Sequence, residues 1–250
     1  ASVDLLNKAM KTTNKMGLNG RQFAKEIVNN LKMAQKYNFK DGTEGLMRMT
    51  QWAMKTRFNM QSIGSMIDNV LEGGLEGVIE QSSRLQVLGG NAAIYSDPFS
   101  MMFNAASSAE DFGQQVLNMT KGLGSIDRKT GETSFNVNEE FMLRNIAKTL
   151  GMDVGELKDI RRSANRRDSV NIAMSAEQKA RFNKDQLDYI GNVAHYSQEK
   201  GGFFVNVKNN KGEYDEVGIN ELSPEQIKAL EPVEHEERVE DYMKSILSGV

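Results

Sequence analysis

The most distinctive residue pattern in this 250-residue chain is a small residue, a glycine and an aliphatic residue at fixed spacing, followed by arginines. Ala147, Gly151 and Leu157 have the spacing of a helix-turn-helix, where the small residue lets two helices touch and the glycine makes the turn. Positive side chains after such an element can bind the phosphates of a nucleic acid. The candidate contacts to a nucleic acid or to another acidic partner are therefore Arg161, Arg162, Arg166 and Arg167.

The same pattern, over residues 144–167, also fits an ordinary pair of packed helices. The second helix would open with Asp153 and Glu156, whose carboxylates repel phosphate. Its first turns lack the Gln, Asn and Arg side chains that read base edges. A plain helical hairpin is the main interpretation of this stretch, and DNA reading is the alternative.

Residues for catalysis or metal binding are scarce. The chain has no Cys and two His, His195 and His235, which removes thiolate chemistry and leaves little material for a histidine metal site or a catalytic triad. His195 is expected at a helix end, as a capping or packed residue. Carboxylates recur at helical spacing in 72–80 and 236–240, but on predicted polar faces. No glycine-rich phosphate loop is present. We expect no enzyme activity, no cofactor and no metal.

The elements that would position these residues are mainly helical. Hydrophobic residues make up 39% of the chain, only three residues are Pro, and no apolar run is long enough to cross a bilayer. The fifteen Met suggest adaptable packing. The predicted fold class is mainly α, a multi-helix bundle with one or two small β-hairpins inserted.

The pattern of apolar residues and turn signals divides the chain into four regions. Residues 1–58 form a three-helix N-terminal region, with helices over about 3–16, 21–37 and 43–58, and residues 60–122 a long helix plus short helices. The long helix is expected to bend at Gly73 and Gly74. Residues 123–200 form a hairpin followed by the helical hairpin region, and 201–250 a β-hairpin and C-terminal helices, one over 234–247. The first hairpin, 125–137, is expected to turn at Gly131 and to place Phe135 and Val137 on one face.

Charge is segregated along the chain, although the formal net charge is only −3. Residues 1–60 carry a net +7, 61–140 a net −7, 141–182 a net +4, and 183–250 a net −7. Such blocks can be solvated faces that compensate one another, or surfaces that pair with neighbouring copies in an assembly.

Several short stretches resemble a segment of tape-measure-type or internal virion proteins of large tailed bacteriophages. The resemblance covers roughly residues 60–230, and residues 1–58 add only generic helices. It rests on Leu-Gln-Val-Leu-Gly-Gly at 85–90, Ser-Asp-Pro-Phe-Ser-Met-Met-Phe-Asn-Ala at 96–105, Lys-Thr-Gly-Glu at 129–132, Ile-Ala-Lys-Thr-Leu-Gly-Met at 146–152, Gly-Gly-Phe-Phe-Val at 201–205 and Glu-Leu-Ser-Pro-Glu-Gln at 221–226.

The resemblance implies a protein that acts by assembly and has no active-site residues. The chain would be part of a longer polypeptide that sets tail length or is ejected with the genome. Its partners would be copies of itself and tail tube, portal or hub proteins, with DNA as a further candidate and membrane contact only during ejection. It would be made in the host cytoplasm and located in the virion. Because heptad regularity is absent, this segment would be a globular portion rather than a rod.

Two other function classes stay open at this point. One is a nucleic-acid-associated protein that uses the hairpin at 144–167. The other is a hydrolase appended to a virion protein, which would require a pocket with converging carboxylates.

Overall fold

The computed structural model describes residues 23, 25–30, 42–127 and 132–230. Outside these residues lie the predicted helix over 3–16, most of the one over 21–37, the turn at Gly131 and the C-terminal helix over 234–247. The described chain is mostly helical, with one two-stranded and one three-stranded antiparallel sheet. The predicted class, mainly α with minor β, is therefore confirmed.

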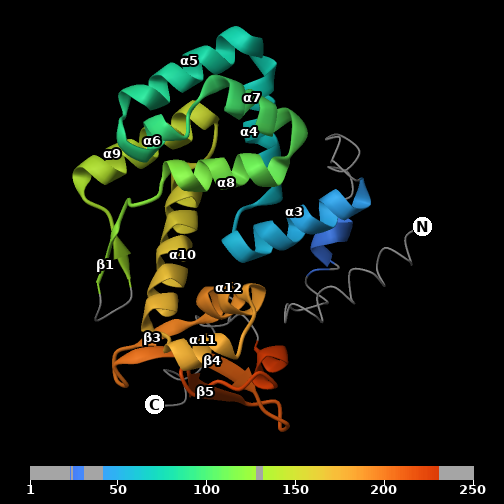
Figure 1. The fold of residues 1–250 in the computed structure, drawn as a ribbon, viewed down its shortest axis with the longest axis vertical. Helices are drawn as coiled ribbons and strands as arrows, with labels where there is room; N and C mark the ends of the chain where they lie inside the picture. The colour runs from blue at the N-terminus through green and yellow to red at the C-terminus, as the bar shows by residue number, and fades with distance from the viewer. Residues whose placement is uncertain (1–22, 24, 31–41, 128–131, 231–250) are drawn as a thin grey trace, which may run out of the picture.

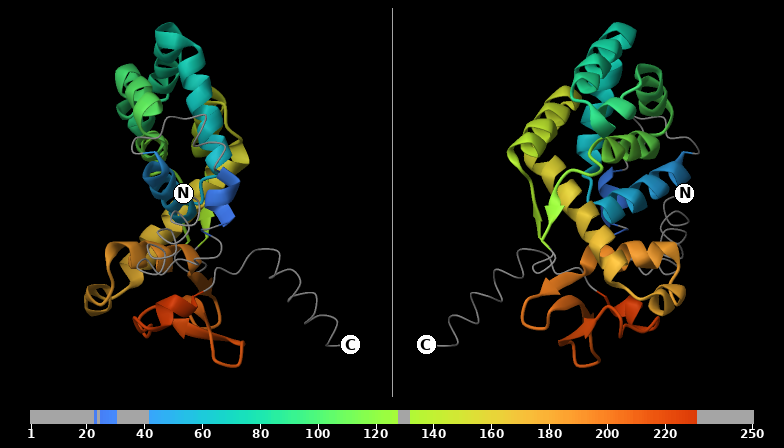
Figure 2. Two further views of the ribbon diagram at one scale, coloured as in Figure 1. Left: turned by 90° about the vertical axis from the view of Figure 1, so that its right-hand side faces the viewer. Right: turned by 60° about the vertical axis from the view of Figure 1, so that its left-hand side comes forward.

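The described residues form two packed bodies that share one long helix. Helix α10 (Val154–Ala173) begins among the other helices and ends beside the three-stranded sheet, as all views show (Figure 1, Figure 2). We call the part built from α3 to α9 with the first half of α10 the helical body. The part built from the end of α10, α11, α12 and the three-stranded sheet is the sheet body.

The helical body is a bundle of short helices packed around one core. Its further helices are α3 (Thr43–Thr56), α4 (Met60–Glu72), α5 (Gly74–Val87), α6 (Gly90–Ile94), α7 (Pro98–Ser107), α8 (Ala109–Met119) and α9 (Val137–Leu150). Its buried core includes Phe23, Leu46, Met49, Ile63, Met66, Leu85, Met101, Phe112, Met119, Leu143, Ile146 and Leu157. Met residues fill much of this core, as expected for flexible side chains between irregularly crossing helices.

The predicted long helix after residue 60 is two helices. Helix α4 ends at Glu72, and Gly74 has a φ of 57°, which a residue with a side chain rarely adopts. The expected bend at Gly73 and Gly74 is therefore confirmed, but it is sharp enough for α5 to cross the end of the bundle (Figure 1).

Side-chain caps fix the starts of several of the short helices. Asp97 accepts a hydrogen bond from Ser100 N at 2.8 Å before α7, and Ser108 accepts one from Asp111 N before α8. The turn between α9 and α10 also follows the predicted pattern. Gly151 has a φ of 74°, and the N–H groups of Gly151 and Met152 both donate to the Ala147 carbonyl. Residues 137–173 thus form the predicted helical hairpin.

The sheet body adds a strand that the sequence pattern does not indicate. Its elements are α11 (Ala176–Ala180), α12 (Lys184–Val193), β3 (His195–Ser197), β4 (Gly202–Lys208), β5 (Tyr214–Gly218) and the 3-10 helix η1 (Gln226–Ala229). The β-hairpin predicted within residues 201–250 is confirmed as β4 and β5, with Val205 opposite Val217. Strand β3 pairs with the other edge of β4. His195 therefore lies in a strand and not at a helix end, because α12 ends at Val193.

The first predicted hairpin is much smaller than expected. Strands β1 (Ser125–Ile126) and β2 (Thr133–Ser134) have two residues each. Val137 is the first residue of α9 and is 85% exposed, so it shares no face with the half-buried Phe135. The capping side chain of Asn136 ends the hairpin at this point, because it accepts hydrogen bonds from Asn138 N and Glu139 N.

The core of the sheet body is separate from that of the helical body. It is formed by Val170, Met174, Phe182, Tyr189, Ile190, Ala194, Val205, Val207, Ile219, Leu222, Ile227 and Leu230. Within the described residues, none of the helices has the length and apolar character needed to span a membrane.

Candidate functional site

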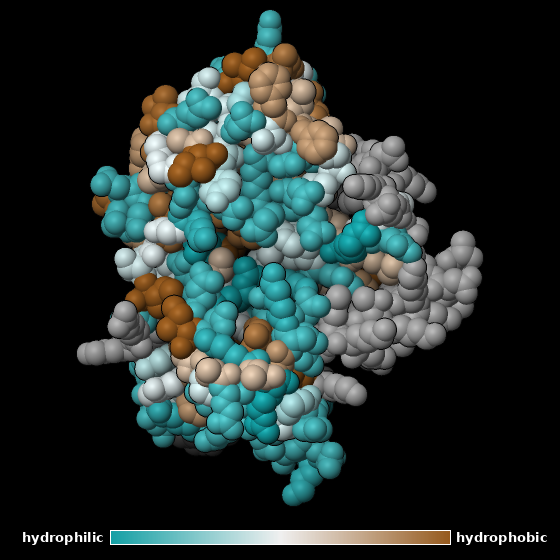
Figure 3. Space-filling view, in the orientation of Figure 1, coloured by the Kyte–Doolittle hydropathy of each residue, from teal (hydrophilic) through white to brown (hydrophobic). Residues whose placement is uncertain are grey.

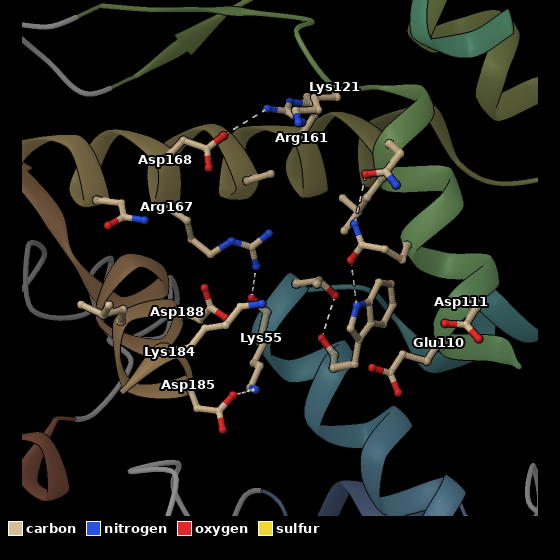
Figure 4. A pocket seen from close by; sticks show the side chains of 18 residues that line it. Lys55, Glu110, Asp111, Lys121, Arg161, Arg167, Asp168, Lys184, Asp185 and Asp188 are labelled. Atoms are coloured by element: carbon tan, nitrogen blue, oxygen red, sulfur yellow. Dashed lines mark hydrogen bonds and ion pairs between the residues drawn. The ribbon is translucent and has the colours of Figure 1, made fainter. Parts of the chain in front are cut away.

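A polar cleft opens where the two bodies meet. It is lined by residues of α3, α8, α10 and α12 and of the turn after α8, and has a volume of about 580 Å³ (Figure 4). We call it the joint cleft. Its apolar wall is formed by Trp52, Leu117, Ala164 and Leu187. Its charged lining residues are Lys55, Glu110, Asp111, Lys121, Arg161, Arg167, Asp168, Lys184, Asp185 and Asp188.

One end of α3 forms the floor of the joint cleft and attaches the sheet body to the helical body. The carbonyl of Lys55 accepts hydrogen bonds from Arg167 Nη1 and from Asn192 Nδ2. Lys55 Nζ pairs with Asp185 Oδ1 at 2.5 Å, and Arg57 Nη2 donates to the Asn192 carbonyl at 3.2 Å. Cations and amide donors at this end satisfy the carbonyls that a helix C-terminus leaves free. The two bodies are thus joined by polar contacts.

The glycines and the tryptophan at the joint explain how closely the helices approach. A Cβ on Gly113 of α8 would lie 2.4 Å from the Trp52 ring, so glycine lets the indole lie against α8. The indole also stacks on Phe58, with ring centroids 5.0 Å apart. A Cβ on Gly191 of α12 would lie 3.0 Å from the Arg167 Cα. Helices α10 and α12 therefore touch backbone to backbone beside the cleft.

The four predicted arginine contacts do not form one surface. Arg161 is 5% exposed and donates through Nε and Nη2 to Asn165 Oδ1, and the Asn165 amide donates to the Leu123 carbonyl. Arg167 is half-buried against the end of α3. Arg162 is exposed, pairs with Asp159 and lies over the Phe135 ring, and Arg166 is half-buried. Arg161 and Arg167 face the joint cleft, whereas Arg162 lies beside the small hairpin.

The start of α10, which would read bases in a helix-turn-helix, is in contact with another helix. Glu156 accepts hydrogen bonds from Ser62 Oγ at 2.6 Å and from Asn59 N at 3.3 Å, at the beginning of α4. Leu157 and Ala147 are buried in the helical body. These residues hold the hairpin against the rest of the bundle.

The carboxylate of Glu110 is destabilised in the joint cleft. Burial raises its pKa, neighbouring Asp111 raises it further, and Arg48 and Lys55 lower it by a smaller amount. Glu110 and Asp111 lie on the side of the cleft away from Arg161 (Figure 4). Among the described residues, no group of three His, Asp or Glu side chains could hold a metal ion.

A second charged cluster lies on the sheet body. His195 Nε2 is 2.6 Å from Glu216 Oε1, and Lys200 Nζ pairs with the other carboxylate oxygen. Hydrogen bonds from Lys200 and then His195 lower the pKa of Glu216. This contact joins the two outer strands of the sheet.

Apolar side chains gather on the surface at the far end of the helical body. Leu75 and Ile79 of α5 are nearly half exposed, and Phe99 and Phe103 of α7 are 64% and 69% exposed. Helices α5 and α7 pack on each other, and the space-filling view shows apolar side chains over this end (Figure 3). We call these four residues the apolar apex.

Sequence reasoning did not find the joint cleft or the apolar apex. The cleft brings together residues as far apart in the chain as Lys55 and Asp188. A local sequence pattern cannot indicate that such distant residues meet. The spacing of Phe99 and Phe103 could have indicated the apolar apex. These two residues are four apart, on the face of a helix opposite the buried Met101 and Ala105.

Comparisons with protein-family models, curated proteins and solved structures found no match to this chain.

Proposed function

We propose that this chain is a structural protein of a tailed bacteriophage particle, of the tape-measure-like or ejected internal type. It acts by assembly in the tail or portal region and in genome delivery. Its partners are copies of itself and tail tube, portal or hub proteins, with DNA only as a further candidate and membrane contact only during ejection. The chain is made in the host cytoplasm and is built into the particle.

The observation that carries this proposal is the exposure of Phe99 and Phe103. Both lie in the stretch 96–105, one of those that resemble the virion proteins. Their rings contribute little to the core of this chain, because they are about two-thirds exposed. Exposed apolar side chains that gather at one place mark surfaces for contact with another protein. A protein that functions within an assembly needs such a surface.

The distribution of arginines favours this role over nucleic-acid binding. A phosphate-binding surface requires positive side chains that face one way. Arg161 and Arg167 instead support the joint between the two bodies, and Arg162 is paired with Asp159.

The test is the composition of purified particles of the phage that encodes this chain. Peptide mass spectrometry with isotope-labelled standards measures its copy number relative to the tail tube protein. We expect a fixed, small number of copies that survives nuclease treatment and gradient purification. Abundant chain in infected cells with none in purified particles would overturn the proposal.

A further inference from the structure

Three arginines at the joint donate hydrogen bonds to neutral acceptors: Arg161 is buried, Arg167 is half-buried and Arg57 is exposed. Arg161 donates to the side-chain oxygen of Asn165, and Arg167 donates to the Lys55 carbonyl. Arg57 donates to the Asn192 carbonyl. Burial lowers the pKa of all three arginines, which remain charged. Although the cleft lining as a whole has as many carboxylates as cations, Arg161 holds its positive charge in a place that is poorly hydrated.

The carboxylates around these arginines neutralise this charge only in part. Asp168 Oδ2 is 3.8 Å from Arg161 Nη2, beyond hydrogen-bonding distance, and the Asp168 side chain is mostly exposed. Asp188 and Asp168 attract Arg167 only at longer range. Within the described residues, no carboxylate hydrogen-bonds to either arginine that lines the cleft. A buried charge without a close counter-charge is costly, so an added anion would be stabilised here.

The joint cleft gives an anion access to this charge. Arg161, Arg167 and Lys121 all line it (Figure 4). Lys121 is exposed and has no ion pair among the residues that the structure describes. Asn165 connects Arg161 to the Leu123 carbonyl, only two residues after Lys121. The acidic pair Glu110 and Asp111 lies elsewhere in the cleft, away from Arg161 and Lys121 (Figure 4).

We propose that the joint cleft binds an oxyanion, a phosphate or carboxylate group, between Arg161 and Lys121 (Figure 4). Arg161 Nη1 and Lys121 Nζ supply donors that have no acceptor within the described residues, and guanidinium groups bind oxyanions with strong, directional hydrogen bonds. The volume of about 580 Å³ suits a small ligand or one charged side chain.

The experiment measures oxyanion binding to the full chain, with inorganic phosphate and acetate as probes and chloride at the same ionic strength as the reference. Differential scanning calorimetry should show a higher Tm in at least one probe than in chloride, because a bound ligand stabilises the folded state. In a proton–nitrogen NMR titration, the Nε–H signal of Arg161 should shift until it saturates. A larger response to phosphate identifies a phosphate ester as the natural group, and a larger response to acetate identifies an acidic side chain.

Lys121→Gln is the test variant, because Lys121 is exposed and its loss should leave the fold intact. We expect it to weaken binding of the preferred probe about tenfold or more, the value of one charged hydrogen bond. Lys211→Gln, in the exposed turn between β4 and β5, is the matched control and should leave binding unchanged. Failure of both probes to raise the Tm above that in chloride, or equal weakening by the two variants, would overturn the proposal.

Discussion

The helical body and the sheet body are built from the same chain in different ways. The helical body has a large core of Phe, Met and Leu side chains from most of its helices, and it leaves an apolar apex exposed at its far end. The sheet body has a smaller core between one sheet, α12 and the end of α10. Between them lie Arg161, Asn165, Arg167 and Asn192, which are polar. Because polar contacts join the two cores, we expect each body to open with a free energy of its own.

The largest expected effect is a loss of stability in the helical body that leaves the sheet body almost unchanged. Phe112 is fully buried in α8, and Phe112→Ala should cost the helical body about 3 to 5 kcal/mol. Native-state hydrogen exchange should show this loss in the amides of α4 and α8. The amides of β4, which open locally at lower cost, should change much less.

Leu222→Ala provides the matched variant in the sheet body. Leu222 is fully buried, and its truncation should lower the protection of β4 and β5 by about 2 to 4 kcal/mol. The α4 amides should then keep their protection. If either variant lowers all amides equally, the chain is one cooperative unit and the comparison between two bodies fails.

The next effect tests the joint itself. Gly191→Ala places a Cβ 3.0 Å from the Arg167 backbone, and the resulting strain should cost about 1 to 3 kcal/mol. Gly77→Ala is the matched control, because a Cβ there meets no atom within 4 Å and alanine favours a helix by up to about 1 kcal/mol. Thermal unfolding should therefore show a lower Tm for the first variant and an unchanged or higher Tm for the second. A Gly191→Ala chain as stable as the Gly77→Ala chain would show that the joint is loosely packed.

A smaller effect concerns the carboxylate that stabilises the sheet body. The pKa of Glu216 is lowered from 4.5, so its ionised form contributes stability above pH 4.5, and this contribution is lost as the pH falls through the lowered pKa. Glu216→Gln should cost about 0.5 kcal/mol at pH 7, because the pair is partly exposed, and nothing in strong acid. Urea unfolding against pH measures this, with Glu213→Gln in the same hairpin as the control. An equal cost at all pH values would mean that packing, not charge, is involved.

The smallest effect has the opposite sign and lies on the other side of the joint. The pKa of Glu110 is raised, so its protonated form favours folding below pH 4.5, and this benefit is lost as the pH rises through the raised pKa. Glu110→Gln should therefore stabilise the chain at pH 7 by about 0.5 kcal/mol or less, since the group is partly exposed. The gain should disappear in acid. A loss of stability at pH 7 would show that the Glu110 carboxylate is paired.

The sequence predicts local features of this fold well and tertiary features poorly. The starts of α7 and α8 and the turn at Gly151 are predicted because Asp97, Ser108 and glycine act within a few residues. Strand β3 is missed because three residues are too few for a pattern, and it forms by pairing with β4.

The candidate site could not be predicted for a related reason. Arg161 has the charge of a surface residue, and only the fold reveals that it is buried beside Asn165. The joint cleft also requires α3, α8, α10 and α12 to meet, and no spacing along the chain encodes that meeting.

The central claim is that the apolar apex, at the end of the helical body, contacts other proteins of the particle. The direct measurement replaces Phe103 by the photo-crosslinker benzoylphenylalanine during infection and irradiates the purified particles. The same replacement of Tyr214, an exposed aromatic residue of the sheet body, is the control. We predict strong cross-links from position 103 to another virion protein or to a second copy of the chain, and few from position 214. Particles that contain the chain but give no cross-links from position 103, or equal ones from both positions, would contradict this account.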